Sequence, residues 1–396
     1  MPPFVLGYGR QSIDQSDIDA VVSVLHSDFL TQGPAVERFE AALAERTGAR
    51  HAVAVSSGTA GLHIACLAAG LGAGDRGLTA AVTFAASSNC LLYVGSEAGF
   101  IDIDRDALGM APIGLEKALA STPDTKAIVP VHFAGLAHAS AEIRALAKGR
   151  VVIEDAAHAI GGKYACGKPV GCGAFSDMSV FSFHPVKTIT TGEGGAVVTN
   201  DGELARRLRA FRSHGIERDP AHFSGSETRE DGHAKPWLYE QQMLGFNYRM
   251  TDIQAALGLS QLGKLDRFLE RRRAIARRYD EAFGKLPHLR LPQSTPQDRA
   301  RSGHHLYVAL FDFAAMRTAR TAFMKKLREQ GIGSQVHYIP VYRHPYYAKR
   351  YGLAPAAFPE AESYYSGCLS LPFYPALTDE DVERVVTTVT QAVTAR

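Results

Sequence analysis

Short apolar runs alternate with helical patterns through the first half of the chain, and this alternation constrains the fold more than any other feature. Near-continuous apolar strands between helices are typical of a parallel sheet that is covered on both faces. We therefore expect an α/β fold, with a three-layer large domain and a mainly parallel sheet. The runs are HAVAV (51–55), LTAAVTF (78–84), GFIDID (99–104), KAIVPVHF (126–133) and RVVIEDA (150–156).

The pattern changes from about residue 265 onward. A chain of 396 residues exceeds the usual domain size of about 100–200 residues, so we predict two domains. They are a large domain over 1–264 and a smaller C-terminal α+β domain over 265–396. The polar stretch 216–240 is too long for an ordinary loop and predicts a lid, a binding loop or an arm to a neighbouring subunit. The basic run 271–278 predicts a solvated helix face.

Composition excludes several classes of protein. The chain has 43 Lys and Arg against 41 Asp and Glu, a net charge of +2, which argues against nucleic acid or a membrane as the partner. Its most apolar window, 78–95, is interrupted by Thr83, Ser87, Ser88 and Asn89 and is too polar to span a bilayer. With no signal-peptide pattern and five scattered cysteines lacking a CxxC pair, we expect a cytoplasmic protein with reduced thiols.

Candidate ligand sites lie where strands end, because open α/β sheets bind ligands at that edge. In VSSGTAGLH (55–63), Ser57, Gly58 and Thr59 separate a strand from a helix. The N–H groups at such a helix start suit a phosphate, although a plain N-cap explains the same residues.

A pair of carboxylates, Glu154 and Asp155, ends the strand in VVIEDAAHAIGG (151–162). Alternation along a strand places one of them in the ligand crevice, where a buried carboxylate needs a cationic partner. The alternative is an Asp that caps the next turn, and His158 taken alone is more typical of a structural histidine.

Lys187 follows the apolar strand in FSFHPVKTITTGEGG (181–195). Desolvation at the rim of an apolar pocket lowers the pKa of a lysine and frees neutral amine for a Schiff base with a carbonyl. The glycines allow close approach of the backbone. A surface lysine beside a turn is the competing interpretation.

In FNYRMTD (246–252), Asn247 and Arg249 stand between apolar neighbours before a helix N-cap. A helix entry with a stacking Tyr248 explains them equally well. Adjacent His304 and His305 are not expected to chelate one ion, because neighbours on a strand face opposite sides; no metal site is predicted.

The combination and order of these signals match the needs of pyridoxal 5'-phosphate, which alternates with pyridoxamine 5'-phosphate. This cofactor requires an anion seat for its phosphate, a carboxylate for its ring nitrogen and a lysine for its aldehyde.

Nearly the whole chain resembles the DegT/DnrJ/EryC1/StrS sugar aminotransferases, which have the fold-type I architecture. The matching stretches are LTQGPAVERFE, SSGTAGLH, VTFAASSNC, IEDAAHAIGGKY, GKPVGCGAFSDMSVFSFHPVKTITTGEGGAVVTN and LGFNYRMTDIQAALGLSQL. The resemblance implies that Lys187 and Asp155 are catalytic. It implies that the cofactor is held by Ser57, Gly58, Thr59, Phe84, Asp155, His158, Ser182, Lys187 and Asn247. Asn247 is expected to reach the phosphate from the other subunit of a homodimer with shared active sites.

Within the family, GYGRQSID, SDFLTQGP, SFHPVKTITTGEGG and VHYIPVYRHPYY are most similar to the branch that makes UDP-4-amino-4,6-dideoxy-N-acetyl-β-L-altrosamine for pseudaminic acid. That likeness implies a nucleotide-sugar substrate, UDP-2-acetamido-2,6-dideoxy-β-L-arabino-hexos-4-ulose, with L-glutamate as amino donor and 2-oxoglutarate as product. The residues expected near the substrate are Tyr8, Phe29, Leu30, Thr31, His184, Glu193, His337 and Tyr338.

Other interpretations remain beside this one. Related branches aminate other UDP-, GDP- or dTDP-linked 4-keto-6-deoxy sugars. The sugar 3-dehydratases of the same fold carry histidine in place of the lysine. A cysteine desulfurase would need an activated cysteine, and no feature of the sequence around Cys166 indicates activation. A regulatory protein that kept the fold is the non-enzymatic alternative.

Overall fold

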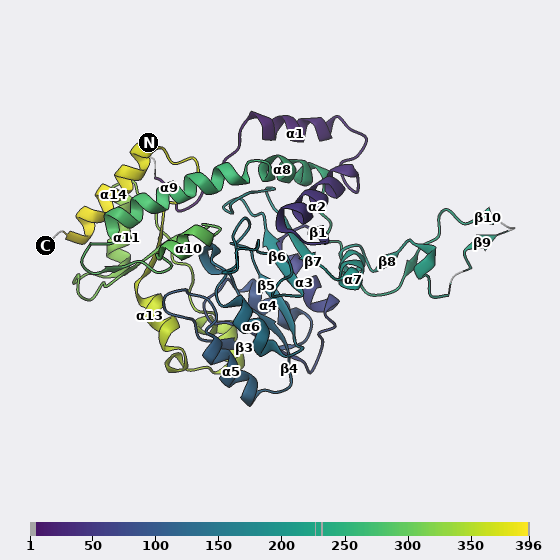
Figure 1. The fold of residues 1–396 in the computed structure, drawn as a ribbon, viewed down its shortest axis with the longest axis horizontal. Helices are drawn as coiled ribbons and strands as arrows, with labels where there is room; N and C mark the ends of the chain where they lie inside the picture. The colour runs from purple at the N-terminus through teal and green to yellow at the C-terminus, as the bar shows by residue number, and fades with distance from the viewer. Residues whose placement is uncertain (1–4, 226, 231–232, 395–396) are drawn as a thin grey trace.

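A seven-stranded sheet with helices on both faces forms the centre of the computed structural model, which describes residues 5–225, 227–230 and 233–394 (Figure 1). The strands lie in the order β1-β7-β6-β5-β4-β2-β3, and β7 runs antiparallel to both its neighbours while the other adjacent pairs are parallel. The predicted α/β class with a mainly parallel sheet is confirmed. The strands are β1 (His51–Val55), β2 (Arg76–Ala80), β3 (Glu97–Ile101), β4 (Thr125–Val129), β5 (Val151–Asp155), β6 (Met178–Ser182) and β7 (Gly195–Thr199).

Both faces of the sheet are buried, which is why its strands are almost continuously apolar. On β7, for example, Val197 packs into the core of one face, whereas Ala196 and Val198 pack into the core of the other. The first face is covered by α3 (Gly58–Ala68), α4 (Ala86–Tyr93) and α7 (Gly202–Arg212). The second is covered by α2 (Pro34–Thr47), α5 (Pro112–Ser121), α6 (Ser140–Ala147) and α8 (Asp252–Leu262), with α1 (Gln15–Leu25) packed on α8 (Figure 1).

The C-terminal region is built on an antiparallel sheet of β12 (Leu289–Arg290), β13 (Tyr307–Phe311) and β14 (Cys368–Leu371). Its helices are α9 (Leu265–Phe283), α10 (Pro296–Arg301), α11 (Arg320–Glu329), α12 (Pro345–Tyr351), α13 (Pro359–Gly367) and α14 (Asp379–Thr394). Helix α9 belongs to both regions, because Phe268 packs with the core under α8 and Tyr279 packs with the small sheet. The domain division at 264/265 stays a prediction.

The expectation of a solvated face over 271–278 is wrong at Arg272, whose side chain is fully buried. Its guanidinium donates to the carbonyl of Phe373 at 2.8 Å and to the carbonyls of His304 and His305 at 3.2 Å. Burial lowers its pKa to about 9. Arg272 lies on the inward stripe of α9 together with Ile275, and backbone carbonyls there accept the bonds that water would otherwise make.

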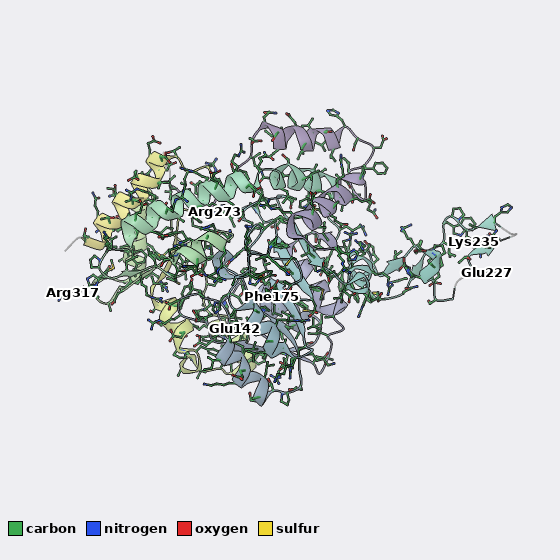
Figure 2. The ribbon with its side chains drawn as sticks, viewed as in Figure 1. Glu142, Phe175, Glu227, Lys235, Arg273 and Arg317 are labelled. Atoms are coloured by element: carbon green, nitrogen blue, oxygen red, sulfur yellow. The ribbon has the colours of Figure 1, made fainter. Side chains whose placement is uncertain are left out.

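The polar stretch 216–240, predicted as a lid, a binding loop or an arm, projects from the body of the protein as an arm (Figure 1). It consists of two short ribbons, β8 (Ile216–Glu217) with β11 (Glu240–Gln241), and β9 (Arg229–Glu230) with β10 (His233–Ala234). Figure 2 labels Glu227 and Lys235 near its far end, where their charged groups lie 3.9 Å apart. Within the described residues, no helix is long and apolar enough to cross a membrane.

Candidate active site

A cavity of about 540 Å³ opens at the edge of the large sheet where β1, β5 and β6 end. It collects most of the site residues that the sequence predicted: Tyr8, Ser57, Gly58, Thr59, Phe84, Asp155, His158, Ser182, His184, Lys187, Glu193, His337 and Tyr338. Parallel strands bring their carboxyl ends to the same edge, which explains why residues from distant parts of the chain converge.

Four predicted residues lie outside this cavity. Phe29 and Leu30 are about half exposed, on the loop between α1 and α2, and Thr31 forms an isolated backbone bridge with Thr251. Asn247 is exposed on the segment that follows the arm. The chain therefore does not bring these four to its own pocket.

Ser57, Gly58 and Thr59 form the turn between β1 and α3. Ser57 is the N-cap of α3, since its hydroxyl accepts the N–H of Ala60 at 3.1 Å, so the capping interpretation holds. The same turn lines the cavity, and the N–H groups in the first turn of a helix have no acceptor within the helix. The turn can therefore cap α3 and still present free N–H groups to the cavity.

Glycines allow three backbone segments to meet at this turn. A Cβ on Gly195 would lie 2.7 Å from the backbone of Ser57 and Gly58, and a Cβ on Gly58 would lie 2.9 Å from Cβ of Ser182. Both distances are shorter than side-chain contacts allow. The glycine loop after Lys187 therefore lets β7 pack directly beneath the turn and keeps Ser182 beside it, as a small anion seat requires.

The ambiguity between Glu154 and Asp155 is resolved by the pleat of β5. Asp155 lines the cavity, where its carboxylate accepts the Ser87 hydroxyl at 2.6 Å and the N–H of Ala157 at 3.1 Å. Glu154 points to the opposite face, where it accepts hydroxyls from Tyr164, Ser176 and Ser179 and lies 3.3 Å from His132. Burial alone would raise the pKa of Glu154, but His132 and these hydroxyls hold it below its usual range. Glu154 is a structural carboxylate.

Lys187 lies in the wall of the cavity, in the segment between β6 and β7. Desolvation lowers its pKa to about 8, and the negative charge of Asp155 opposes that shift without cancelling it. A measurable fraction of the amine is therefore neutral near pH 7.5, as nucleophilic attack on a carbonyl requires.

His158 is held neutral in one tautomer. The N–H of Ala134 donates to its Nδ1 at 3.3 Å, so the ring proton is on Nε2, which lies 3.3 Å from the Tyr338 hydroxyl. Burial, and then the charges of Lys187 and His337, lower its pKa well below the usual value. His158 can thus donate a hydrogen bond at the cavity wall without carrying charge.

Two supporting residues were not predicted as part of the site. Ser87 bonds to Asp155, and the His305 ring lies 4.3 Å from that of His158, centroid to centroid. The signal for Ser87 was present in the hydroxyls that interrupt the apolar window 78–95. His305 gave no such signal, because its contact joins segments about 150 residues apart. His304 turns elsewhere, with Nε2 2.7 Å from the carbonyl of Arg299, and no metal-binding cluster exists among the described residues.

The arrangement suits a phosphorylated aldehyde with a basic ring. The lining of one cavity combines the N–H groups of a helix start, a lysine of lowered pKa, a carboxylate and a neutral histidine. Phe84, 59% exposed, stands at the opening. The fold and these residues together define the fold-type I pyridoxal-phosphate aminotransferases.

Comparison with known proteins supports the assignment to the aminotransferases. Residues 11–390 match the model of the DegT/DnrJ/EryC1/StrS aminotransferase family, and the chain belongs to that family. It is 40% identical over 384 residues to the spore coat polysaccharide biosynthesis protein SpsC of Bacillus subtilis, covering 96% of this chain and 95% of that protein.

Solved structures give the same assignment. PseC of Helicobacter pylori, an aminotransferase involved in the biosynthesis of pseudaminic acid, superposes with a TM-score of 0.87 at 32% identity, over 99% of this chain and all of that one. The PLP form of the putative sugar aminotransferase Spr1654 of Streptococcus pneumoniae superposes with a TM-score of 0.86 at 28% identity. The match covers 98% of this chain and 99% of that one. The chain is a sugar aminotransferase, and its family implies pyridoxal phosphate as cofactor.

The lowered pKa of Lys187 predicts its reactivity in protein freed of cofactor. We expect the pH dependence of reductive methylation at Lys187, followed by peptide mapping, to have its midpoint near pH 8. Asp155→Asn removes the charge that favours the ammonium, so the midpoint should fall further. A midpoint near the ordinary lysine value of about 10.4, in either protein, would contradict the burial that lowers the pKa.

Gly195→Ala should damage the anion seat selectively, because the added Cβ meets the backbone of Ser57 and Gly58. We expect the dissociation constant of pyridoxal phosphate to rise roughly 10- to 100-fold, the loss of one or two good hydrogen bonds. The affinity for pyridoxal, which lacks the phosphate, should change little. In the matched control Gly202→Ala, a Cβ meets no heavy atom closer than 3.8 Å, and both affinities should persist. Equal losses for the two ligands in Gly195→Ala would argue against a phosphate seat at this turn.

Proposed function

We propose that this protein transfers the amino group of L-glutamate to the C4 ketone of a nucleotide-linked 4-keto-6-deoxy sugar. The observation that carries the proposal is the convergence of Lys187, Asp155 and the turn Ser57–Thr59 in one cavity. Amino transfer through pyridoxal phosphate needs a lysine amine, a carboxylate and an anion seat together.

In this proposal Ser57, Gly58, Thr59 and Ser182 bind the cofactor's phosphate. Phe84 would pack against its ring, and the Nε2–H of His158 would donate a hydrogen bond to the phenolic oxygen. These contacts are the same before and after amino transfer. They therefore contribute binding and orientation rather than selective stabilisation of a transition state.

Asp155 and Lys187 have the chemical roles. Asp155 keeps the ring nitrogen protonated, so that the bound cofactor can accept electrons from the substrate carbon. Lys187 would hold the cofactor's aldehyde, and its amine would serve as the base that takes the proton from the α-carbon of glutamate. It runs the same transfer in reverse for the sugar. A positioned base of this kind contributes about 10²–10⁴-fold to the rate, and its lowered pKa suits that work near neutral pH.

For the acceptor we propose UDP-2-acetamido-2,6-dideoxy-β-L-arabino-hexos-4-ulose. The likeness to PseC supports this choice, as do further side chains that line the cavity. Burial raises the pKa of Tyr8 and Tyr338 and lowers that of His337 to about 4, so uncharged donors and acceptors face a sugar. His184 and Glu193, 4.0 Å apart, are more exposed. Another UDP-, GDP- or dTDP-linked 4-keto-6-deoxy sugar is the alternative acceptor.

A panel of UDP-, GDP- and dTDP-linked 4-keto-6-deoxy sugars, each offered with glutamate, tests the acceptor. We expect an aminated product, identified by mass and NMR, with highest kcat/KM for the UDP sugar named above. The yellow absorbance of the protein should fade with glutamate and return with 2-oxoglutarate or the acceptor. A higher kcat/KM for a dTDP or GDP sugar would move the assignment to another branch. No product from any sugar, with no response to glutamate, would overturn the proposed function.

We also propose that the working unit is a homodimer whose active sites are shared. Three observations support it. Asn247 lies outside its own cavity, Phe29 and Leu30 are exposed apolar side chains, and the projecting arm carries Trp237 with 66% of its surface exposed. A second copy would bring Asn247 to the phosphate and cover the apolar groups.

Complementation tests this sharing. Lys187→Ala and Asn247→Ala subunits carrying different tags are co-expressed, and dimers with both tags are isolated. If Asn247 serves the partner's site, each mixed dimer has one intact site and one doubly altered site, so we expect about half the wild-type activity. Both single-variant homodimers should be nearly inactive. Mixed dimers as inactive as the homodimers would mean that Asn247 serves its own chain.

A further inference from the structure

Two hydroxyl groups, one just before α4 and one in its first turn, form a chain that leads to the carboxylate of Asp155. Ser87 is fully buried and its Oγ lies 2.6 Å from Oδ2 of Asp155. The hydroxyl of Thr83, also buried, lies 2.7 Å from the same Oγ. Thr83 and Asp155 line the cavity and Ser87 lies behind them, and neither hydroxyl has a role in the proposed function above.

The direction of the chain follows from counting protons. A carboxylate only accepts hydrogen bonds, and a serine hydroxyl has one proton. Ser87 must therefore donate to Asp155, which leaves its oxygen as the acceptor for Thr83. The bonds run from Thr83 to Ser87 to Asp155, so each hydroxyl donates to the group that follows it.

The carboxylate is thereby fixed at both oxygens. Oδ2 accepts the Ser87 hydroxyl, and Oδ1 accepts the N–H of Ala157. Two donors on different oxygens set the plane of the carboxylate, and bonds from buried donors to a charged acceptor are among the strong ones. The remaining lone pairs can then meet a donor in the cavity at a defined angle.

We infer that Ser87, oriented by Thr83, is a positioning residue that holds the carboxylate of Asp155 toward the ring nitrogen of the cofactor. The inference rests on the proposed function, in which Asp155 faces that nitrogen. Ser87 itself acts through Asp155 and touches neither cofactor nor substrate in this role.

The chain offers a matched control on the same helix. Ser88 is also fully buried, but its hydroxyl bonds to that of Tyr347 at 2.8 Å and not to Asp155. Ser87→Ala and Ser88→Ala each remove one buried hydroxyl from α4, so a general loss of stability should affect both alike.

Binding of pyridoxal phosphate is compared with binding of its 1-deaza analogue, in which carbon replaces the ring nitrogen. We expect Ser87→Ala to weaken binding of pyridoxal phosphate about 10-fold, the range of one hydrogen bond to a charged group. Binding of the deaza analogue should be almost unchanged, since it makes no bond to Asp155. Ser88→Ala should change neither. With pyridoxal phosphate bound, kcat of Ser87→Ala should fall on the order of 10- to 100-fold, and Ser87→Thr should recover most of it.

Each outcome decides a separate question. Equal weakening of both ligands in Ser87→Ala, or behaviour indistinguishable from Ser88→Ala, would overturn the inference and leave the proposed function intact. Failure of the wild-type protein to bind pyridoxal phosphate would overturn the proposed function itself. If Ser87→Ala cannot be purified folded, Thr83→Val replaces it, because it removes the orienting bond without changing shape. Thr83→Val should weaken binding of pyridoxal phosphate less than the roughly 10-fold expected for Ser87→Ala, and it should leave binding of the deaza analogue almost unchanged. Equal weakening of both ligands would overturn the inference.

Discussion

The amine of Lys187 stands in a desolvated wall within the electrostatic reach of Asp155, and the rest of the site serves this pairing. Burial lowers the pKa of the lysine to about 8, while the carboxylate limits the fall. A fully solvated lysine would stay charged and unreactive, and a lysine without a nearby anion would lose its proton too readily to serve as an acid. Neutral His158 and His337 add no competing positive charge beside it.

The backbone makes this pairing possible. Asp155 ends β5 and Ser182 ends β6, so the two strands place their last residues at the same edge of the sheet. Gly195 then begins β7 against the turn at Ser57 and Gly58, a contact that no larger residue allows. Lys187 lies in the segment that joins β6 to β7. The buried strand before it and the glycines after it therefore keep the lysine close to the turn and to Asp155.

Much of this could be predicted from the sequence, because period, turn chemistry and residue type are local properties. Strands β1 to β5 each overlap one of the five apolar runs that were identified, and Lys187, Asp155 and Gly58 line one cavity. Other features depend on contacts between distant segments. Whether Glu154 or Asp155 faces the cavity depends on the pleat of β5. The burial of Arg272 depends on carbonyl acceptors about 30 and 100 residues away.

The most direct measurement is reduction of the purified protein with borohydride in the presence of pyridoxal phosphate, followed by digestion and peptide mapping. The account predicts one pyridoxyl group per chain, attached to the ε-amine of Lys187, and its loss when glutamate is added before the reductant. A label on any other lysine, or no label at all, would contradict the central claim that the buried amine after β6 is the group that binds the aldehyde.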